Sequence, residues 1–399
     1  MSSPPLRPHP SSLRPTAVIL AVVVLVALNL RIALSSLPAV ATEIQTETGW
    51  SAAIIGALTT VPVLAMGVFA LVVPRMAGYF GRRTTVAIAL IMMMIGLGMR
   101  ALGAIALTLF VSALFAGIAI AILGGLVPGI VREQLSHSMG TATALWTASM
   151  MGGAALGAAL TVPLAQLLGG WNWALAFWSI PAAIALIAWT GIEHGQPNHH
   201  RPENPVRIKN LPWRNPTAWS LTVFLTLNSV VFYSALAWIA PSYQERGYSP
   251  ETAGLYFGIF TIGQVVGALV LPRWSHRTKY RRSLFIATLL GCAGALVLIA
   301  FVPHFAPPIV LAVFSFNLSG GFAMALGLLS EYAYDADASA RLTAMGFAVT
   351  YSVAAFGPFA AGAIMDTIGS WPLVFSLLAF VVLVQAATVP LLKRNLYVH

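Results

Sequence analysis

Long apolar runs, separated by short polar segments, repeat along the whole chain. A helix that crosses the hydrocarbon core of a bilayer needs about 20 mostly apolar residues. The runs have this length, and they lack the alternation of apolar and polar residues that marks the strands of a membrane barrel. The pattern therefore predicts an all-α membrane protein with twelve transmembrane helices, at residues 16–40, 50–73, 84–100, 103–131, 139–167, 172–192, 216–241, 250–272, 283–302, 307–331, 341–365 and 372–392.

Polar segments divide these helices into two groups of six. The longest of them, residues 193–215, is rich in proline, histidine and arginine and joins the sixth helix to the seventh. The apolar run that follows the Ser/Pro-rich first fifteen residues is too long for a signal peptide, so we expect an uncleaved first helix. The predicted organisation is a tail (1–15), an N-terminal bundle (16–192), a linker (193–215), a C-terminal bundle (216–392) and a second tail (393–399).

Composition and charge support a membrane protein and predict its orientation. The chain is 58% hydrophobic and 8% charged, whereas soluble domains carry about 25% charged residues. Lys and Arg accumulate in cytoplasmic loops. With both termini in the cytoplasm, all 21 Lys and Arg residues except Arg31, Arg100 and Arg246 fall on cytoplasmic segments. The net charge of +10 therefore indicates a lipid bilayer as partner and not a nucleic acid.

The two halves repeat in sequence. Gly49-Trp50-Ser51 recurs as Gly247-Tyr248-Ser249. Further collinear matches pair the second, fourth and fifth helices with the eighth, tenth and eleventh, including Pro74-Arg75 with Pro272-Arg273, Gly129 with Gly327, Glu133 with Glu331, and Gly169 and Trp171 with Gly369 and Trp371. We therefore expect two six-helix bundles related by a pseudo-twofold axis.

This organisation resembles the major facilitator superfamily. The segment from Pro74 to Arg83 is similar to the signature that this superfamily carries between its second and third helices, although the usual acidic residue is replaced by Gly78. The resemblance implies a monomeric secondary transporter without a cofactor, with a solute site near the midplane between the halves. It also implies alternating access by rocking of one half against the other, in a cell inner membrane.

Shorter stretches resemble the cyanate/2-nitroimidazole permease family within that superfamily. Asn29 to Ser36 matches the family pattern, Leu145 to Gly153 and Thr261 to Gln264 look like the cyanate side, and Asn228, Tyr233 and Trp238 look like the nitroimidazole side. The resemblance implies transport of a small anionic or heteroaromatic solute. The alternative is efflux of neutral aromatic compounds.

Arg31 is the sharpest candidate for a binding residue. A charge inside a span costs roughly 2.5 kcal/mol or more, and such residues usually line a cavity or pair with another group. No acidic residue lies at a comparable depth, so we predict that the guanidinium binds an anion. The alternative is that it reaches the membrane surface or caps helix carbonyls. Packing and interhelical hydrogen bonds are the alternatives for the other candidates of the same site, which are Ser35, Trp146, Asn228, Tyr233, Trp238, Gln264, Asn317 and Tyr351.

Charged residues at the predicted cytoplasmic ends suggest a gate. Glu133 and Glu331 occupy equivalent ends of the fourth and tenth helices, on the same side of the membrane as Arg75 and Arg273. Ion pairs between them could lock the outward-open state. The alternative is solvated loop charge, because exposed ion pairs contribute little.

Other functional classes fit the sequence poorly. The chain has no HExxH or GxSxG motif and no buried acidic pair, so we predict neither an enzyme nor a metal site. Because Cys292 is the only cysteine of the chain, metal sites built on cysteine clusters are excluded. Asp366 lies near the outer end of the eleventh helix, and the core lacks a titratable carboxylate or histidine. This favours exchange against a counter-anion, uniport, or coupling to protons through the solute itself.

Overall fold

The computed structural model describes residues 13–134, 139–191, 211–334 and 336–392, which are almost entirely helical. In these ranges, twelve helical segments are long and apolar enough to cross a membrane, which confirms the predicted number. Four of the twelve consist of two consecutive helices, counting the short 3-10 helices. The elements of the first half are α1 (Leu13–Ala39), α2 (Ala41–Thr48), α3 (Ala52–Ala70), α4 (Val73–Phe80), α5 (Arg82–Gly98), η2 (Met99–Leu102), α6 (Ala106–Gln134), α7 (Met139–Leu168), α8 (Trp171–Phe177) and α9 (Ser179–Gly191).

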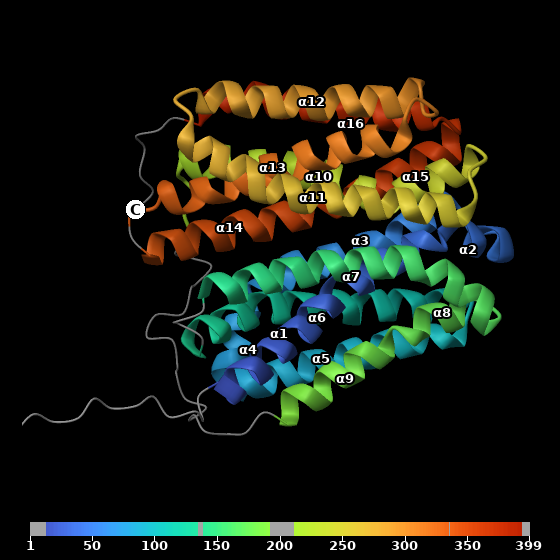
Figure 1. Cartoon of the computed structure of the whole chain (residues 1–399), viewed down its shortest axis with the longest axis horizontal. Helices are drawn as coiled ribbons and strands as arrows, with labels where there is room; N and C mark the ends of the chain where they lie inside the picture. The colour runs from blue at the N-terminus through green and yellow to red at the C-terminus, as the bar shows by residue number, and fades with distance from the viewer. Residues whose placement is uncertain (1–12, 135–138, 192–210, 335, 393–399) are drawn as a thin grey trace, which may run out of the picture.

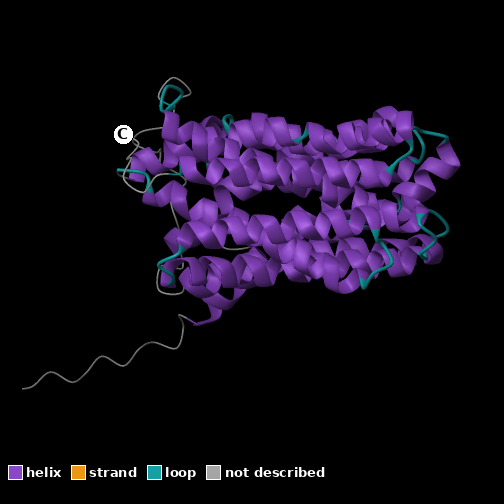
Figure 2. Cartoon of the chain, turned by 90° about the horizontal axis from the view of Figure 1, so that it is seen from above, coloured by secondary structure: helices purple, strands orange, loops and turns teal. Residues whose placement is uncertain are grey.

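The second half follows the same plan. Its elements are α10 (Pro216–Glu245), α11 (Pro250–Arg277), α12 (Arg281–Phe301), α13 (Pro307–Glu331), α14 (Ala336–Ala354), α15 (Phe356–Ile368), α16 (Trp371–Thr388) and η5 (Val389–Leu391). The two halves lie side by side as separate helical bundles, one blue to green and the other yellow to red (Figure 1). A view turned by 90° shows the same long, roughly parallel helices (Figure 2).

Both described chain ends, at Leu13 and Leu392, lie at one end of the bundle, on the left in Figure 1. We call this the terminus end and the opposite one the far end. The short helix α2 lies at the far end, beside the start of α3 (Figure 1).

The sequence repeat is present in the geometry of the far end. The indole Nε1 of Trp171 donates to Glu47 Oε2 at 2.6 Å, and that of Trp371 donates to Glu245 Oε2 at 2.7 Å. In both halves the serine after this glutamate caps the next helix, since Ser51 accepts from Ile54 N and Ser249 from Thr252 N. Equivalent side chains of the two halves therefore fix the starts of the second and eighth spans.

The eleventh span is broken into α14 and α15 at Ala355. Pro358 lacks an N–H group, so it cannot continue the hydrogen-bond ladder of α14. Two carbonyls at the break accept side-chain donors instead. Ala355 O accepts from Thr60 Oγ1 of the other half, and Pro358 O accepts from Trp238 Nε1 at 2.8 Å.

Glycines allow the closest helix contacts. A Cβ at Gly153 of α7 would overlap the Leu28 backbone of α1, and one at Gly267 of α11 would overlap the Phe316 backbone of α13. Small residues at such contacts are typical of packing inside membranes, where backbone approach replaces hydrophobic burial as the main attraction.

Candidate functional site

Arg31 lies on α1 and faces the other half of the molecule. Its guanidinium carbon lies 5.3 Å from the ring centroid of Phe232 on α10. The side chain is half-buried, and its charge lies within electrostatic reach of the Tyr233 and Tyr351 hydroxyls. Within the described residues Arg31 makes no hydrogen bond and no ion pair. A cation at the boundary between the halves therefore keeps its donors available.

The aromatic neighbours of Arg31 form one connected group. Phe232 and Tyr233 pack edge to face with centroids 4.9 Å apart, and Tyr233 packs in the same way on Tyr351 at 6.2 Å. Phe347 continues the group, 5.4 Å from Tyr351 on α14. We call Arg31, Phe232, Tyr233, Phe347 and Tyr351 the Arg31 cluster. Three of its members, Phe232, Phe347 and Tyr351, remain partly exposed although they lie in the middle of their spans.

The Arg31 cluster contains three of the residues expected in the solute site and two that the sequence analysis missed. Arg31, Tyr233 and Tyr351 are brought together from α1, α10 and α14. Phe232 and Phe347 were not expected, because apolar aromatics are common in spans and carry no sequence signal of their own. Their spacing holds a usable clue, since Phe347 is four residues before Tyr351 and so lies on the same helix face.

Gln264 and Trp146 remain compatible with a solute site. Gln264 of α11 is 5% exposed, and its amide makes no hydrogen bond to any described residue. Trp146 of α7 is partly buried against the apolar core. The structure assigns neither of them a competing polar partner.

Four other expected residues make contacts within or between helices. Asn228 donates to Leu318 O at 3.2 Å and so joins α10 to α13, and Trp238 donates to Pro358 O. Ser35 is 1% exposed and lies against Gly157, between α1 and α7. Asn317 bonds its own helix at Val313 O and lines a groove between α11 and α13. These positions correspond to the packing and hydrogen-bonding alternatives for the four side chains.

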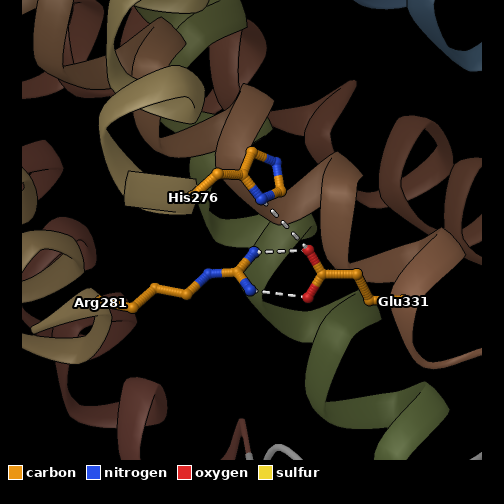
Figure 3. Close-up of polar contacts among 3 residues, drawn as sticks. All are labelled: His276, Arg281 and Glu331. Carbon is orange, nitrogen blue, oxygen red and sulfur yellow. Dashed lines mark hydrogen bonds and ion pairs between the residues drawn. The ribbon is translucent and has the colours of Figure 1, made fainter. Parts of the chain in front are cut away.

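The expected gate residues whose side chains are described, Arg75, Arg273 and Glu331, lie at the terminus end and make no described contact between the halves. Glu331 of α13 accepts two hydrogen bonds from Arg281 of α12, at 2.6 and 2.9 Å, and His276 of α11 lies 4.0 Å away (Figure 3). Arg75 and Arg273 each donate to the carbonyl four residues earlier, at Leu71 and Leu269. Glu133 belongs to the last turn of α6, and its side chain falls outside the described part of the chain.

Hydrogen bonds between described residues of the two halves lie at the far end or near the middle. Asp366 of α15 accepts from the backbone N–H groups of Ala52 and Ala53, at 2.7 and 2.8 Å. Nearby, Gln166 Nε2 donates to Glu251 Oε1 at 2.9 Å, and Gln244 Nε2 donates to Ala39 O at 3.4 Å. Side-chain contacts thus connect the two halves at the far end.

Arg100 and Arg246, the two cations expected outside, are withdrawn from solvent. Arg100 is 3% exposed and donates to Ser112 Oγ, Ser36 Oγ and Ala33 O, so it links the third span to α1 and α6. Arg246 lies between the rings of Tyr243 and Phe375, 5.7 and 5.5 Å away, and burial lowers its pKa. Arg100 is the last residue of the predicted third span, 84–100, whereas the helical segment continues to Leu102.

The described residues hold no group of three His, Cys, Asp or Glu side chains that could bind a metal ion. The Arg31 cluster offers groups that can recognise a solute. A guanidinium offers up to five N–H donors in a planar fork, and the surrounding rings offer flat apolar faces. Such a site fits a small planar solute that carries negative charge.

Comparison with known proteins places this geometry in a family context. The profile of the Major Facilitator Superfamily matches residues 19–355 and 240–395. The cyanate transport protein CynX of Escherichia coli is 29% identical over 88% of this chain and 91% of its own length. The 2-nitroimidazole transporter of the same organism is 29% identical over 89% of this chain and 90% of its own.

Solved structures show the same fold. The nucleoside transporter NupG (D323A mutant) superposes with a TM-score of 0.79 at 16% identity, over 94% of this chain and 99% of that one. A D-xylose-proton symporter superposes with a TM-score of 0.71 at 18% identity, over 96% of this chain and 98% of that one. The twelve spans are thus arranged as in transporters, in a multi-pass membrane protein.

Proposed function

This chain belongs to the major facilitator superfamily, and from that membership we propose that it carries a small planar anion across the membrane, bound at the Arg31 cluster. Members of the superfamily are secondary transporters and not enzymes. The observation that supports an anionic solute is the state of Arg31, which makes no ion pair or hydrogen bond with any described residue. A bound anion would supply the missing partner.

The geometry favours a small solute with a flat shape. The Phe232 face holds the guanidinium from one side, a contact that contributes about 0.5–2 kcal/mol depending on its exposure to water. Tyr233 and Tyr351 can donate their hydroxyl protons to the same anion. Cyanate-like ions and small carboxylates of planar heteroaromatics carry the negative charge that such a site requires. Of the two Escherichia coli relatives, one is named for cyanate and the other for the planar heteroaromatic 2-nitroimidazole.

A second candidate function is efflux of neutral aromatic compounds. It is supported by the three aromatic side chains of the Arg31 cluster that keep exposed surface, because ring faces bind aromatic solutes without any need for charge. In that case Arg31 serves to hold Phe232 and Tyr233 in place.

We further propose that the protein works by alternating access in a bacterial inner membrane, with its termini in the cytoplasm. The Asp366 contacts would close the outer side, and the Glu331 region would close the inner side in the opposite state. The described spans place no carboxylate at the Arg31 cluster. This supports exchange, uniport, or coupling through the solute's own proton.

Purified protein provides the test. Its apparent melting temperature is measured with cyanate, bicarbonate, 2-nitroimidazole and small aromatic carboxylates, for the native chain, Arg31→Ala and Arg31→Lys. A ligand that binds the folded state raises this temperature by mass action. We expect at least one anion to stabilise the native chain and not Arg31→Ala. Stabilisation by neutral heteroaromatics alone, kept in Arg31→Ala, would support efflux instead.

Transport by proteoliposomes completes the test. The anion that stabilises the protein should be taken up by vesicles that contain the native chain and not by those that contain Arg31→Ala. Asn317→Ala is the matched control, because Asn317 lies in a span but bonds its own helix. Equal loss of uptake in both variants would show that general destabilisation, and not anion binding, explains the effect of Arg31→Ala.

A further inference from the structure

A groove runs along one face of α11 and leads toward the terminus end. Its first part has a volume of about 580 Å³ and lies between α11 and α13, lined by apolar side chains and the Asn317 amide. Its second part, of about 420 Å³, is lined by Leu269, Val270, Arg273, Trp274 and Arg277. We call the two parts together the α11 groove.

The α11 groove belongs to the lipid-facing surface. Ile262 and Val266 in its first part are 62% and 44% exposed, and Trp274 in its second part is 57% exposed. Leu269 and Val270 lie between them and are 44% and 43% exposed, so exposed positions recur every three or four residues and form one stripe along the helix. The helices α11 and α12 both pack along α13 but hardly touch each other. A strip of α13 therefore stays uncovered between them.

Two cations at the terminus end of the groove have no acidic partner among the side chains that the structure describes. Arg273 donates one N–H to Leu269 O at 2.6 Å, and Arg277 makes no hydrogen bond or ion pair with any described residue. The acidic side chain of this region, Glu331, is occupied by Arg281. Trp274 lies between the two arginines in sequence, and tryptophan is enriched at the level of lipid headgroups.

The dimensions match one leaflet of a bilayer. From Ile262 to Arg273 the helix advances eleven residues, or about 16 Å at 1.5 Å per residue. Half of the hydrocarbon core is about 15 Å thick. An acyl chain that enters the first part of the groove would thus hold its headgroup beside the arginines.

We infer that the α11 groove binds an anionic phospholipid, with an acyl chain between α11 and α13 and its phosphate on Arg273 and Arg277. Basic residues at the cytoplasmic ends of spans bind anionic headgroups in this way. The site is separate from the Arg31 cluster. The inference therefore does not depend on which solute the protein carries.

The test uses delipidated, detergent-solubilised protein. Phosphatidylglycerol, phosphatidylethanolamine and phosphatidylcholine with identical acyl chains are added separately. Bound lipid is counted by native mass spectrometry, and the melting temperature is recorded. We expect one phosphatidylglycerol to be retained and to raise the melting temperature more than the other two lipids do. In Arg273→Gln/Arg277→Gln its affinity should fall roughly 30-fold.

Two further variants separate the headgroup from the acyl chain. Val266→Trp places a bulky ring in the first part of the groove and leaves both arginines intact, so it should also weaken phosphatidylglycerol binding. Arg75→Gln is the matched control, because Arg75 also donates to the carbonyl four residues earlier, in the other half, but lines neither part of the groove. It should retain the lipid. Should the double variant fail to fold, Val266→Trp and the comparison of the three lipids still test whether the groove binds an anionic phospholipid.

Three results would overturn the inference. Equal stabilisation by all three lipids would mean that charge is not recognised. Stabilisation by glycerol 3-phosphate to the same extent would mean that the arginines bind a free anion and not a lipid. A protein dimer that forms on delipidation and is abolished by Val266→Trp would mean that a second copy occupies the groove.

Discussion

Asp366 caps a helix that belongs to the opposite half of the molecule. Its two carboxylate oxygens lie 2.7 Å from Ala52 N and 2.8 Å from the neighbouring Ala53 N, at the start of α3. Hydrogen bonds to a carboxylate are about twice as strong as those between neutral groups, and negative charge is favourable at a helix N-terminus. This contact is therefore the strongest single side-chain link described between the halves.

Removal of this carboxylate should open the far end. Hydrogen bonds to charged groups contribute about 1.5–3 kcal/mol, so Asp366→Ala should favour the far-end-open state by at least tenfold. The measurement is an electron–electron distance between spin labels at Leu167 and Phe305, both exposed at the far end, in a Cys292→Ala background. The distance distribution should shift to longer values.

The control for this experiment is Gln166→Ala, which removes the exposed bond to Glu251. Exposed contacts contribute at most about 1 kcal/mol, so this variant should leave the distances almost unchanged. If Asp366→Ala also leaves them unchanged, the capping contact does not control closure.

The ring of Phe232 should matter for solute affinity through its contact with Arg31. Phe232→Leu removes the cation–π contact and should weaken solute binding between about twofold and thirtyfold, whereas Phe232→Trp should preserve it. Binding is measured by calorimetry with the anion that stabilises the protein. Phe347→Leu is the comparison, because Phe347 packs on Tyr351 and has no described contact with Arg31. Equal losses in the two leucine variants would argue against a specific role for the cation–π contact.

Arg100 should be important for stability and not for solute recognition. Arg100→Ala leaves Ser36, Ser112 and the Ala33 carbonyl without their donor. Each unsatisfied buried group costs about 1–3 kcal/mol, so the variant should melt several degrees lower. Arg100→Met should lose less, because it fills the space without placing a charge there. A melting temperature unchanged in Arg100→Ala would show that the three bonds contribute nothing.

Glu331 offers a way to separate a gate from a local ion pair. Glu331→Gln should lower the melting temperature little, because exposed pairs contribute about 0–1 kcal/mol, but it should slow transport if Glu331 alternates between partners. Exchange of the two charges, in Arg281→Glu/Glu331→Arg, restores the local pair. A gate that requires Glu331 to meet a cation of the other half should not recover in this double variant. Full recovery of uptake would favour a purely local role.

Glu43 predicts a dependence of stability on pH at the far end. Burial raises its pKa, and the nearby Glu47 raises it further. The folded state therefore favours protonated Glu43. The resulting stabilisation is complete below the unfolded pKa and is lost as the pH rises through the folded value. Glu43→Gln should stabilise the protein at neutral pH by less than about 1 kcal/mol, since the side chain is largely exposed. Melting curves from pH 4 to 8 should converge at the acidic end.

Substitution of Glu47 should change the stability in the opposite direction to substitution of Glu43. Its carboxylate accepts the Trp171 indole N–H, so Glu47→Gln should destabilise the protein at neutral pH. A stabilising effect in both variants would mean that general charge reduction, and not the burial of Glu43, determines the outcome.

Hydropathy was sufficient to predict the spans, because each must cross a fixed thickness of hydrocarbon and therefore has a minimum length. Arg31 could also be singled out from the sequence, since a charge inside an apolar run is energetically costly unless it has a specific role. The rotation of each helix about its own axis could not be predicted in the same way. Asn228, Trp238 and Asn317 have the polarity of site residues, yet their donors bond to carbonyls on neighbouring turns or helices. Sequence alone does not tell which side of a helix faces such a carbonyl.

The repeat illustrates a second limit. The matched residues Trp171 and Trp371 were evident, but their bonds to Glu47 and Glu245 were not, since each bond joins residues more than 120 positions apart. Asp366 was noted only as a charge near a helix end. Its contact with Ala52 depends on how the halves meet, which hydropathy does not encode.

The break at Ala355 divides the eleventh span into two parts with different attachments. The part after the break, α15, ends at the residues that hold α3 across the boundary, whereas α14 carries Phe347 and Tyr351 of the Arg31 cluster. Because Pro358 interrupts the backbone hydrogen bonds between α14 and α15, α14 can bend while α15 keeps its position. A solute that displaces Tyr351 would therefore move the part of this span toward the terminus end while the far-end contacts of α15 stay in place, which is the order of movements that the proposed alternating access requires.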